Sequence, residues 1–158
     1  MDEIRSRYSE ILARCRETPG CYIHSTDPRN TLDTAPDERE KFWEELYASP
    51  GFGIWQGNFN DMLNDREANA LASEFIAKKI RQRVNDPITA EKLIPKNHGF
   101  GTRRVPLETN YYEVYNQSNV ELIDINDTPI QTITQNGIQT TECEHQLDMI
   151  IYATGFDA

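Results

Sequence analysis

The chain has 158 residues, of which 37% are apolar and 27% charged, and a formal net charge of −10 at pH 7. This composition is typical of one ordinary globular domain and excludes a disordered chain. The negative charge repels polyphosphate backbones, so we expect no nucleic-acid partner. With no apolar run long enough to span a bilayer and no secretory signal at the start, we expect no membrane partner and a cytoplasmic location.

Cysteines and histidines give no sign of a metal site or of a disulfide framework. Neither a CxxC pair nor an HxxxH pair occurs, and the number of cysteines is odd. We therefore expect no metal and mostly structural thiols. The residues concerned are Cys15, Cys21, Cys143, His24, His98 and His145.

The first ninety-odd residues read as helical. Apolar residues recur at helical spacing over Asp2–Cys15, Asp37–Tyr47 and Asn60–Val84, and a short helix is expected over Thr89–Leu93. Proline and glycine separate these segments. We expect amphipathic helices joined by irregular loops.

The end of the long predicted helix carries several cations close together. Cations are favoured at a helix C-terminus by the helix dipole alone, so this cluster is a weak indication of function. A solvated helix end is the simpler interpretation. The residues are Lys78, Lys79, Arg81 and Arg83.

An aromatic loop with spaced glycines covers residues 51–57. Its spacing, GxGxxxG, differs from the dinucleotide-binding fingerprint, and no strand precedes it. Two interpretations stay open. Phe52 and Trp55 fill a core, or they line a cavity for a substrate or cofactor.

The last third of the chain reads as strands. Apolar residues alternate over Asn119–Ile125, and Ile130–Thr141 predicts a hairpin that turns at Asn136 and Gly137. The run Leu147–Ala153 is almost continuously apolar, as in a strand buried on both faces of a parallel sheet. We therefore predict an α/β fold in which helices precede strands.

Two places are candidates for chemistry. The first is Ala153-Thr154-Gly155, because ligands of α/β sheets bind beyond the carboxyl ends of strands, where small residues allow close approach. A common turn is the alternative. The second is the pair Arg103 and Arg104 on a loop rich in glycine and proline, which suggests an anion site in an acidic protein. Pairing of these arginines with surface carboxylates such as Glu108 is the alternative.

Read as one string, residues 95–116 are PKNHGFGTRRVPLETNYYEVYN, and this string closely resembles the Baeyer–Villiger monooxygenases of the cyclohexanone and phenylacetone monooxygenase group. The similarity continues through residues 119–124, 128–130 and 147–158. It extends more weakly to Phe52-Gly53-Ile54-Trp55 and the helix beyond.

The resemblance implies an FAD- and NADPH-dependent enzyme that inserts one atom of O2 next to the carbonyl of a small-molecule ketone, or that oxygenates a thioether. In the matching GT(K/R)R loop, Arg104 would lie near the flavin and stabilise an anion formed during oxygen transfer. Arg103 stands where the family usually has Lys and would contact the NADP 2′-phosphate. Thr102 of the same loop and Ala153, Thr154 and Gly155 would also contact cofactors.

The resemblance also implies an incomplete, Rossmann-like part of such an enzyme. Residues 1–94 would be the helical part of the NADPH-binding domain, and residues 95–158 would return toward the FAD domain. Since both GxGxxG loops are missing from the chain, we expect an interior fragment that is inactive alone. A nitrogen- or sulfur-oxidising flavin monooxygenase, or a non-catalytic interaction piece, are the alternatives.

Overall fold

The computed structural model describes residues 2–18 and 20–155, and these divide into two compact units. The helical unit runs up to Asn116 and the strand unit begins at Gln117. The helical unit extends to residue 116 because Phe100, Tyr112 and Tyr115 pack against its cores. No helix in the described part of the chain has the length and apolarity needed to cross a membrane.

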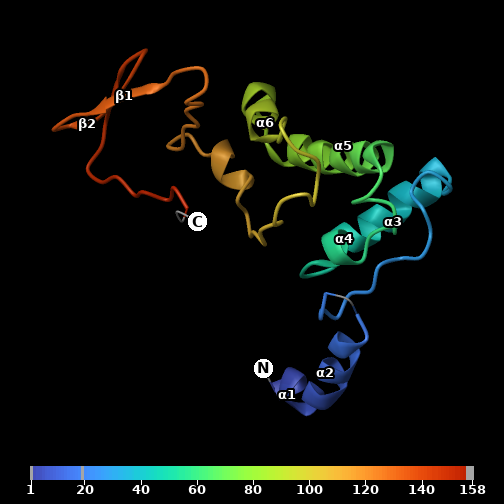
Figure 1. Cartoon of the computed structure of the whole chain (residues 1–158). Helices are drawn as coiled ribbons and strands as arrows, with labels where there is room; N and C mark the ends of the chain where they lie inside the picture. Colours follow the sequence, from blue (N-terminus) through green and yellow to red (C-terminus); the bar gives the residue numbers. More distant parts are fainter. Residues whose placement is uncertain (1, 19, 156–158) are drawn as a thin grey trace. The chain divides into compact units, whose positions relative to one another are not determined.

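The helical unit contains the helices of the described chain, in the order that Figure 1 shows. Their bounds are α1 Asp2–Ser6, α2 Tyr8–Arg16, α3 Pro36–Ala48, α4 Gly53–Gln56, α5 Arg66–Arg83, α6 Pro87–Leu93 and the 3-10 turn η1 Glu113–Asn116.

Three of the differences from the predicted helices have local causes. The first predicted helix is split at Arg7, which leaves helical geometry at a place where no residue is buried. Helix α5 begins at Arg66 rather than near residue 60, because the Asp65 carboxylate caps it by accepting from the N–H groups of residues 67 and 68. Helix α6 begins two residues earlier than predicted, with Pro87 after the Asp86 cap.

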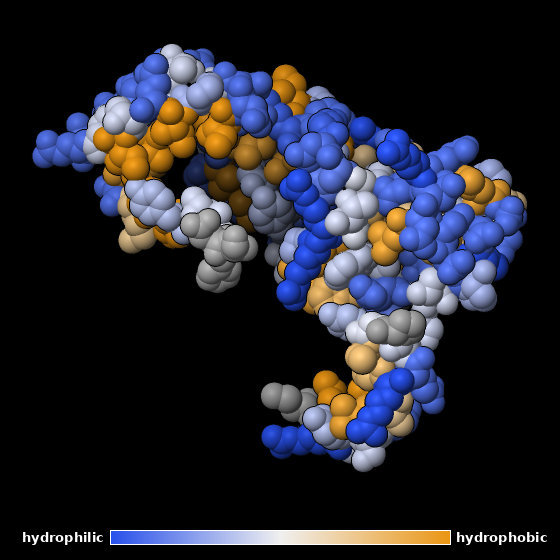
Figure 2. Space-filling model, in the orientation of Figure 1, coloured by the Kyte–Doolittle hydropathy of each residue, from blue (hydrophilic) through white to orange (hydrophobic). Residues whose placement is uncertain are grey.

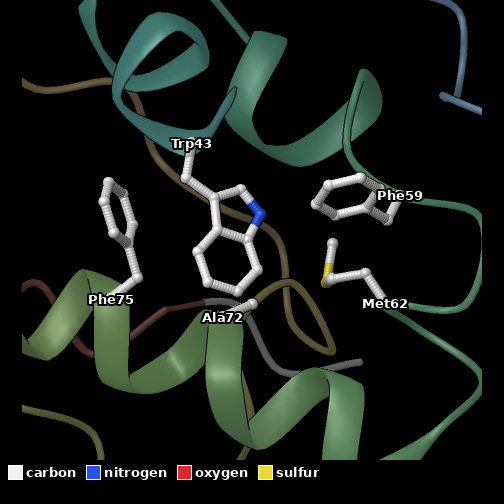
Figure 3. Packing of buried hydrophobic residues seen from close by; sticks show 5 residues of the cluster. All are labelled: Trp43, Phe59, Met62, Ala72 and Phe75. Carbon is white, nitrogen blue, oxygen red and sulfur yellow. The ribbon is translucent and has the colours of Figure 1, made fainter. Parts of the chain in front are cut away.

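A core forms where α3 crosses α5 and the segment between them. Trp43, Phe59, Met62, Ala72 and Phe75 contact one another there and are almost completely buried (Figure 3). Burying each large side chain contributes on the order of 2 kcal/mol. This core fixes α5, and side chains of α5 in turn bind the loop that forms the candidate site.

A second core joins the C-terminal half of α5 to α6. Its buried residues, Ala77, Ile80, Val84, Ala90 and Ile94, come from these two helices and the residues that follow each of them. Tyr112 and Tyr115 cover it from a later part of the chain. The chain after α6 is therefore fixed against α5.

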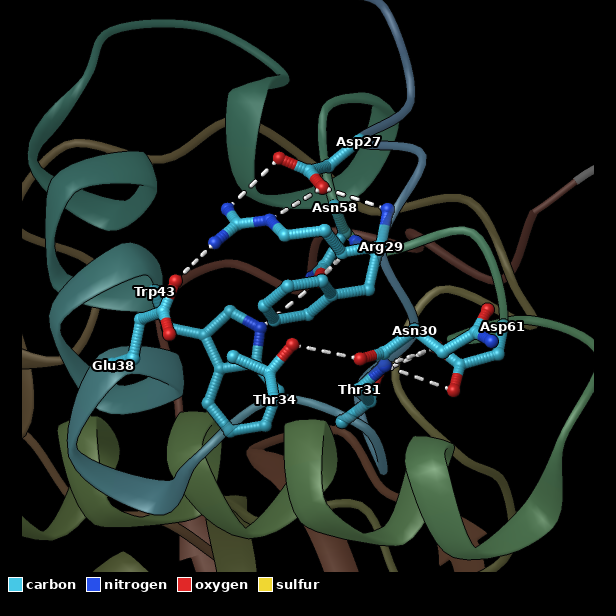
Figure 4. Close-up of polar contacts among 10 residues, drawn as sticks. Asp27, Arg29, Asn30, Thr31, Thr34, Glu38, Trp43, Asn58 and Asp61 are labelled. Carbon is cyan, nitrogen blue, oxygen red and sulfur yellow. Dashed lines mark hydrogen bonds and ion pairs between the residues drawn. The ribbon is translucent and has the colours of Figure 1, made fainter.

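Polar contacts fasten the segment before α3 to the first core (Figure 4). Arg29 forms ion pairs with Asp27 at 2.9 Å and with Glu38 of α3 at 2.6 Å. The Asp61 carboxylate accepts from both the backbone N–H and the hydroxyl of Thr31, at 2.7 to 2.9 Å. An irregular segment is thus fixed by hydrogen bonds where regular structure is absent.

The strand unit is an antiparallel sheet in the order β1-β2-β3, with β1 Ile130–Ile133, β2 Gly137–Thr140 and β3 Glu144–Gln146. The predicted hairpin is confirmed, with Ile133 opposite Ile138 across the turn. A side chain at Gly137 would place its Cβ 1.9 Å from the His145 carbonyl oxygen. Glycine is therefore required by the close approach of β3.

The predicted strands over 119–125 and 147–153 do not form in the described structure. A strand needs the backbone of a neighbour, and the sheet of this unit pairs only β1, β2 and β3. The apolar run is consequently exposed, with Met149 74% and Ile151 81% accessible. Figure 2 shows the apolar surface that gathers on this unit. The parallel strand of the predicted fold does not form in the described chain, whereas its mixture of helices and strands is confirmed.

Candidate anion site in the helical unit

The loop Gly99–Pro106, here called the arginine loop, is fixed to the helices through its backbone. Asn69 of α5 donates its side-chain N–H to the carbonyl of Phe100 at 2.9 Å, and the Ser73 hydroxyl accepts from the Phe100 N–H at 2.9 Å. From α4, the Trp55 indole N–H donates to the carbonyl of Gly101 at 3.2 Å. Two helices therefore determine where the loop lies.

Two glycines make this close attachment possible. A Cβ at Gly99 would lie 1.8 Å from the Asn69 side-chain oxygen. Gly101 has φ of +76°, and a Cβ there would lie 2.9 Å from Trp55 Cδ1. Side chains at these positions would push the loop away from α4 and α5.

The loop presents its two arginines to solvent. Arg103 and Arg104 are exposed, and within residues 2–18 and 20–155 neither forms an ion pair or hydrogen bond. The alternative that Glu108 neutralises them is wrong, because the Glu108 carboxylate binds Arg83. Thr102 turns back instead, and its hydroxyl donates to the Gly99 carbonyl at 2.8 Å.

Arg83, at the end of α5, binds both nearby carboxylates. Its guanidinium donates to Glu108 at 2.7 and 3.1 Å and to Glu113 at 2.6 and 2.8 Å. It also donates to the Tyr47 hydroxyl at 3.0 Å and lies 4.9 Å from the centre of the Tyr112 ring. The hydrogen bonds that Arg83 donates to Glu113 and Glu108 raise the pKa of Arg83 and lower the pKa of both carboxyls.

The predicted solvated end of α5 is therefore an ion-paired surface. Lys78 and Lys79 pair with Glu40 and Glu44 of α3. Arg81 pairs with Glu74 at 2.7 Å and with Glu91 of α6 at 2.6 Å. These cations join α5 to its neighbours and to the segment after the arginine loop.

A cavity of about 570 Å³ lies beside the arginine loop, within the helical unit. Its wall combines the aromatic rings of Phe52, Trp55 and Tyr112 with Arg103 and Arg104. Phe52 and Trp55 both line this cavity, and Trp55 also packs against the first core; that the cavity receives a substrate or cofactor stays a prediction. The volume is within the range of small-molecule sites.

Burial perturbs the acidity of Tyr112, which lines the cavity, and of Tyr115, which packs against the second core. Loss of solvent raises the pKa of Tyr112. Burial, together with a hydrogen bond to the Tyr111 hydroxyl at 3.1 Å, raises the pKa of Tyr115 to about 12. Both groups are neutral at physiological pH, so the arginines supply the positive charge of this wall.

The structure brings some predicted site residues together and leaves others apart. Arg103 and Arg104 share the cavity wall, and Thr102 shapes their loop. Ala153, Thr154 and Gly155 are exposed residues of the strand unit and do not follow a strand. Residues 156–158, which the family string also includes, lie outside the described residues.

Sequence reasoning missed the residues that hold the arginine loop. Asn69 and Ser73 lie on a helix whose pattern indicated its buried stripe and, at its end, a cluster of cations. The only sign in the sequence that the helix binds another segment was a polar residue, Asn69, beside that stripe. It does not identify the partner, which is 31 residues away in the chain.

The residues present fit the phosphate of a nucleotide cofactor but not its pyrophosphate. Two guanidinium groups without carboxylate partners suit a phosphate, which accepts bidentate hydrogen bonds. Within the described residues, no helix begins at a GxGxxG loop of the kind that receives a pyrophosphate. No group of three or more potential metal ligands occurs among those residues either.

Comparison with known proteins gives clear relatives, although no family model matches the chain. It is 53% identical over 158 residues to 2-oxo-Δ3-4,5,5-trimethylcyclopentenylacetyl-CoA monooxygenase of Pseudomonas putida, covering 100% of this chain and 29% of that protein. It is 43% identical over 139 residues to a Baeyer–Villiger monooxygenase of Pseudooceanicola batsensis, covering 87% of this chain and 25% of that protein.

A solved structure matches equally well. A crystal structure of OTEMO in complex with FAD and NADP superposes with a TM-score of 0.96 at 53% identity, covering 99% of this chain and 29% of that one. The chain thus spans less than a third of these proteins. In sequence and in structure, its close relatives are the flavin-dependent Baeyer–Villiger monooxygenases.

Proposed function

We propose that this chain supplies part of the NADPH- and flavin-facing site of a monooxygenase that inserts one oxygen atom next to a ketone carbonyl. The observation that carries the proposal is the pair Arg103 and Arg104, which lie without partners among the described residues on the wall of an aromatic cavity. The likeness to relatives that act on oxo compounds and that bind FAD and NADP supports it.

In this proposal, the two arginines have different roles. Arg103 binds the 2′-phosphate of NADPH through charge-assisted hydrogen bonds. Arg104 stabilises negative charge that develops on oxygen and substrate, because a fixed guanidinium needs little rearrangement when the charge appears. FAD and NADPH, when bound, supply the electrons and the activation of O2. Thr102 keeps the loop turned so that both arginines face the cavity.

The strand unit would complete a dinucleotide-binding fold in this enzyme. The run 147–153 is apolar and exposed, as expected of a strand whose neighbours come from other chain segments. Ala153, Thr154 and Gly155 would then follow a strand end, where small residues let a cofactor approach the backbone. Residues 1–94 would belong to the NADPH-binding domain, and residues 95–158 would return toward the FAD domain.

A hybrid enzyme tests the proposal. In the full-length Pseudomonas putida relative, the matched segment is replaced by this chain, which aligns over its whole length. We expect the hybrid to bind FAD and to oxygenate the relative's 2-oxo substrate with NADPH. A folded, FAD-loaded hybrid without product would contradict the proposal.

Substitutions in the hybrid enzyme separate the two arginines. Arg104→Ala should still allow NADPH to bleach the flavin absorbance, but product formation should fall on the order of 100-fold or more. Arg103→Ala should weaken NADPH binding on the order of tenfold. Arg66→Ala, an exposed arginine outside the cavity, is the matched control. Unchanged turnover in Arg104→Ala would remove Arg104 from the mechanism.

The chain alone should neither retain FAD nor oxidise NADPH. Since it has no GxGxxG loop, the purified 158-residue chain should retain no FAD and consume no NADPH. Absorbance near the flavin bands and an NADPH oxidation assay measure this. A yellow, FAD-loaded chain would show that the cofactor site is more complete than proposed.

A further inference from the structure

Arg83 lies where it controls the charge of the cavity. The cavity is lined by Arg83, by both arginines of the arginine loop and by Glu108. The Glu108 side chain exposes 28% of its surface, so without a cation it would be a negative group on the same wall. A free carboxylate there would compete with an anionic ligand for the loop arginines.

Arg83 is well placed to prevent this competition. Its side chain is 22% exposed and binds Glu108 through two nitrogens, in the planar geometry that suits a carboxylate. The backbone N–H of Tyr111 donates to the same carboxylate at 2.9 Å. Glu108 is therefore held by two groups, neither of which belongs to the arginine loop.

We propose that Arg83 is a positioning residue that keeps Glu108 away from Arg103 and Arg104, so that the two arginines stay available to the phosphate of NADPH. The inference rests on the proposed function, which supplies the ligand. Arg83 does not contact that ligand in this proposal. It acts by neutralising Glu108 and holding its carboxylate in place.

Glu113 provides an internal comparison. Arg83 also donates two hydrogen bonds to Glu113, at 2.6 and 2.8 Å, but Glu113 does not line the cavity. If Arg83 acted only as a structural link, the two glutamates would be equivalent. If Arg83 acts on the charge of the cavity, only removal of the Glu108 charge should restore the NADPH affinity that is lost with Arg83.

The experiment measures the dissociation constant of NADPH in the hybrid enzyme at low and high salt. Arg83→Gln should weaken binding on the order of five- to tenfold at low salt, and the loss should shrink at high salt, where charges are screened. Arg83→Gln with Glu108→Gln should restore the affinity to within about twofold. Arg83→Gln with Glu113→Gln should not restore it.

Arg81→Gln is the matched control. Arg81 lies one half-turn away on α5, has two carboxylate partners and does not line the cavity. We expect NADPH affinity within about twofold of the parent. An equal loss in Arg81→Gln, or failure of Glu108→Gln to rescue Arg83→Gln, would overturn the proposal.

A second pair of variants does not depend on the folding of Arg83→Gln. Leu107 lines the cavity and is 62% exposed, so a polar side chain is tolerated there. Leu107→Glu adds a third carboxylate near Arg83, whose guanidinium is already bound by Glu108 and Glu113. It should therefore weaken NADPH binding several-fold, on the order of the Arg83→Gln effect, whereas Leu107→Gln should not. Equal affinities for these two variants would overturn the proposal.

Failure of this inference can be told apart from failure of the proposed function. If Arg103→Ala and Arg104→Ala both leave NADPH binding and turnover unchanged, the cavity is not the cofactor site and the proposed function fails. If those variants behave as expected but Glu108→Gln does not rescue Arg83→Gln, only the role of Arg83 fails.

Discussion

The side chain of Asn58 offers a test of the first core. Its removal should lower the free energy of unfolding more than the replacement of the Trp43 ring by a phenyl ring does. Asn58 is 2% exposed, and its oxygen accepts from the Trp43 indole N–H at 2.9 Å and from the Phe59 backbone N–H at 2.8 Å. Its side-chain N–H donates to the Ile54 carbonyl at 2.8 Å. Asn58→Ala therefore removes the partner of two buried donors and one acceptor.

The expected magnitudes follow from this count. Each buried group without a partner costs about 1 to 3 kcal/mol, so the loss of three partners in Asn58→Ala should lower the free energy of unfolding by at least about 3 kcal/mol. Trp43→Phe removes one hydrogen bond and part of a ring, yet the Asn58 oxygen keeps the Phe59 N–H. Its cost should be about 2 kcal/mol.

Urea unfolding of the chain, followed by circular dichroism at 222 nm, measures both values, because the helices of the described chain lie in the helical unit. The control is Asn64→Ala, an exposed asparagine that should change the free energy of unfolding by less than about 0.5 kcal/mol. The m-value should stay constant in all three variants. If Asn58→Ala costs less than Trp43→Phe, the hydrogen-bond reasoning is refuted.

Two further predictions concern the neighbourhood of the cavity. Gly101→Ala should weaken NADPH binding to the hybrid enzyme, because the new Cβ would lie 2.9 Å from Trp55 in a backbone conformation with φ of +76°. Titration with NADPH measures the affinity, and an unchanged affinity would contradict this prediction. Since Arg83 lowers the pKa of Glu108 below its usual 4.5, the ion pair stabilises the chain above that pH and is lost as the pH falls through the lowered pKa. Urea unfolding between about pH 6 and pH 3 should show this loss, and Glu108→Gln should reduce it.

The sequence predicted those elements whose stability is local to the chain. Helices α3 and α5 carry apolar stripes at helical spacing, and Trp43 and Phe75 of those stripes are buried where predicted. The hairpin was predictable because its turn residues, Asn136 and Gly137, adjoin both strands. The arginine loop was recognisable from its own glycines.

What could not be predicted depends on partners far apart in the chain. The run 147–153 has the composition of a buried strand, but composition does not supply the neighbouring strand that pairing requires. Arg83 has partners 25 and 30 residues away, and a helix-end cation looks the same with or without them. Pairing of this kind is visible only in three dimensions.

The way the arginine loop is attached bears on how freely its sequence can change. Asn69, Ser73 and Trp55 bind the main chain of the loop, at Phe100 and Gly101, and not the side chains that follow. Residues 103 and 104 could therefore be exchanged in a library without loss of the attachment, provided that Thr102 is kept. Cofactor preference could then be altered at these positions while the fold of the loop is retained.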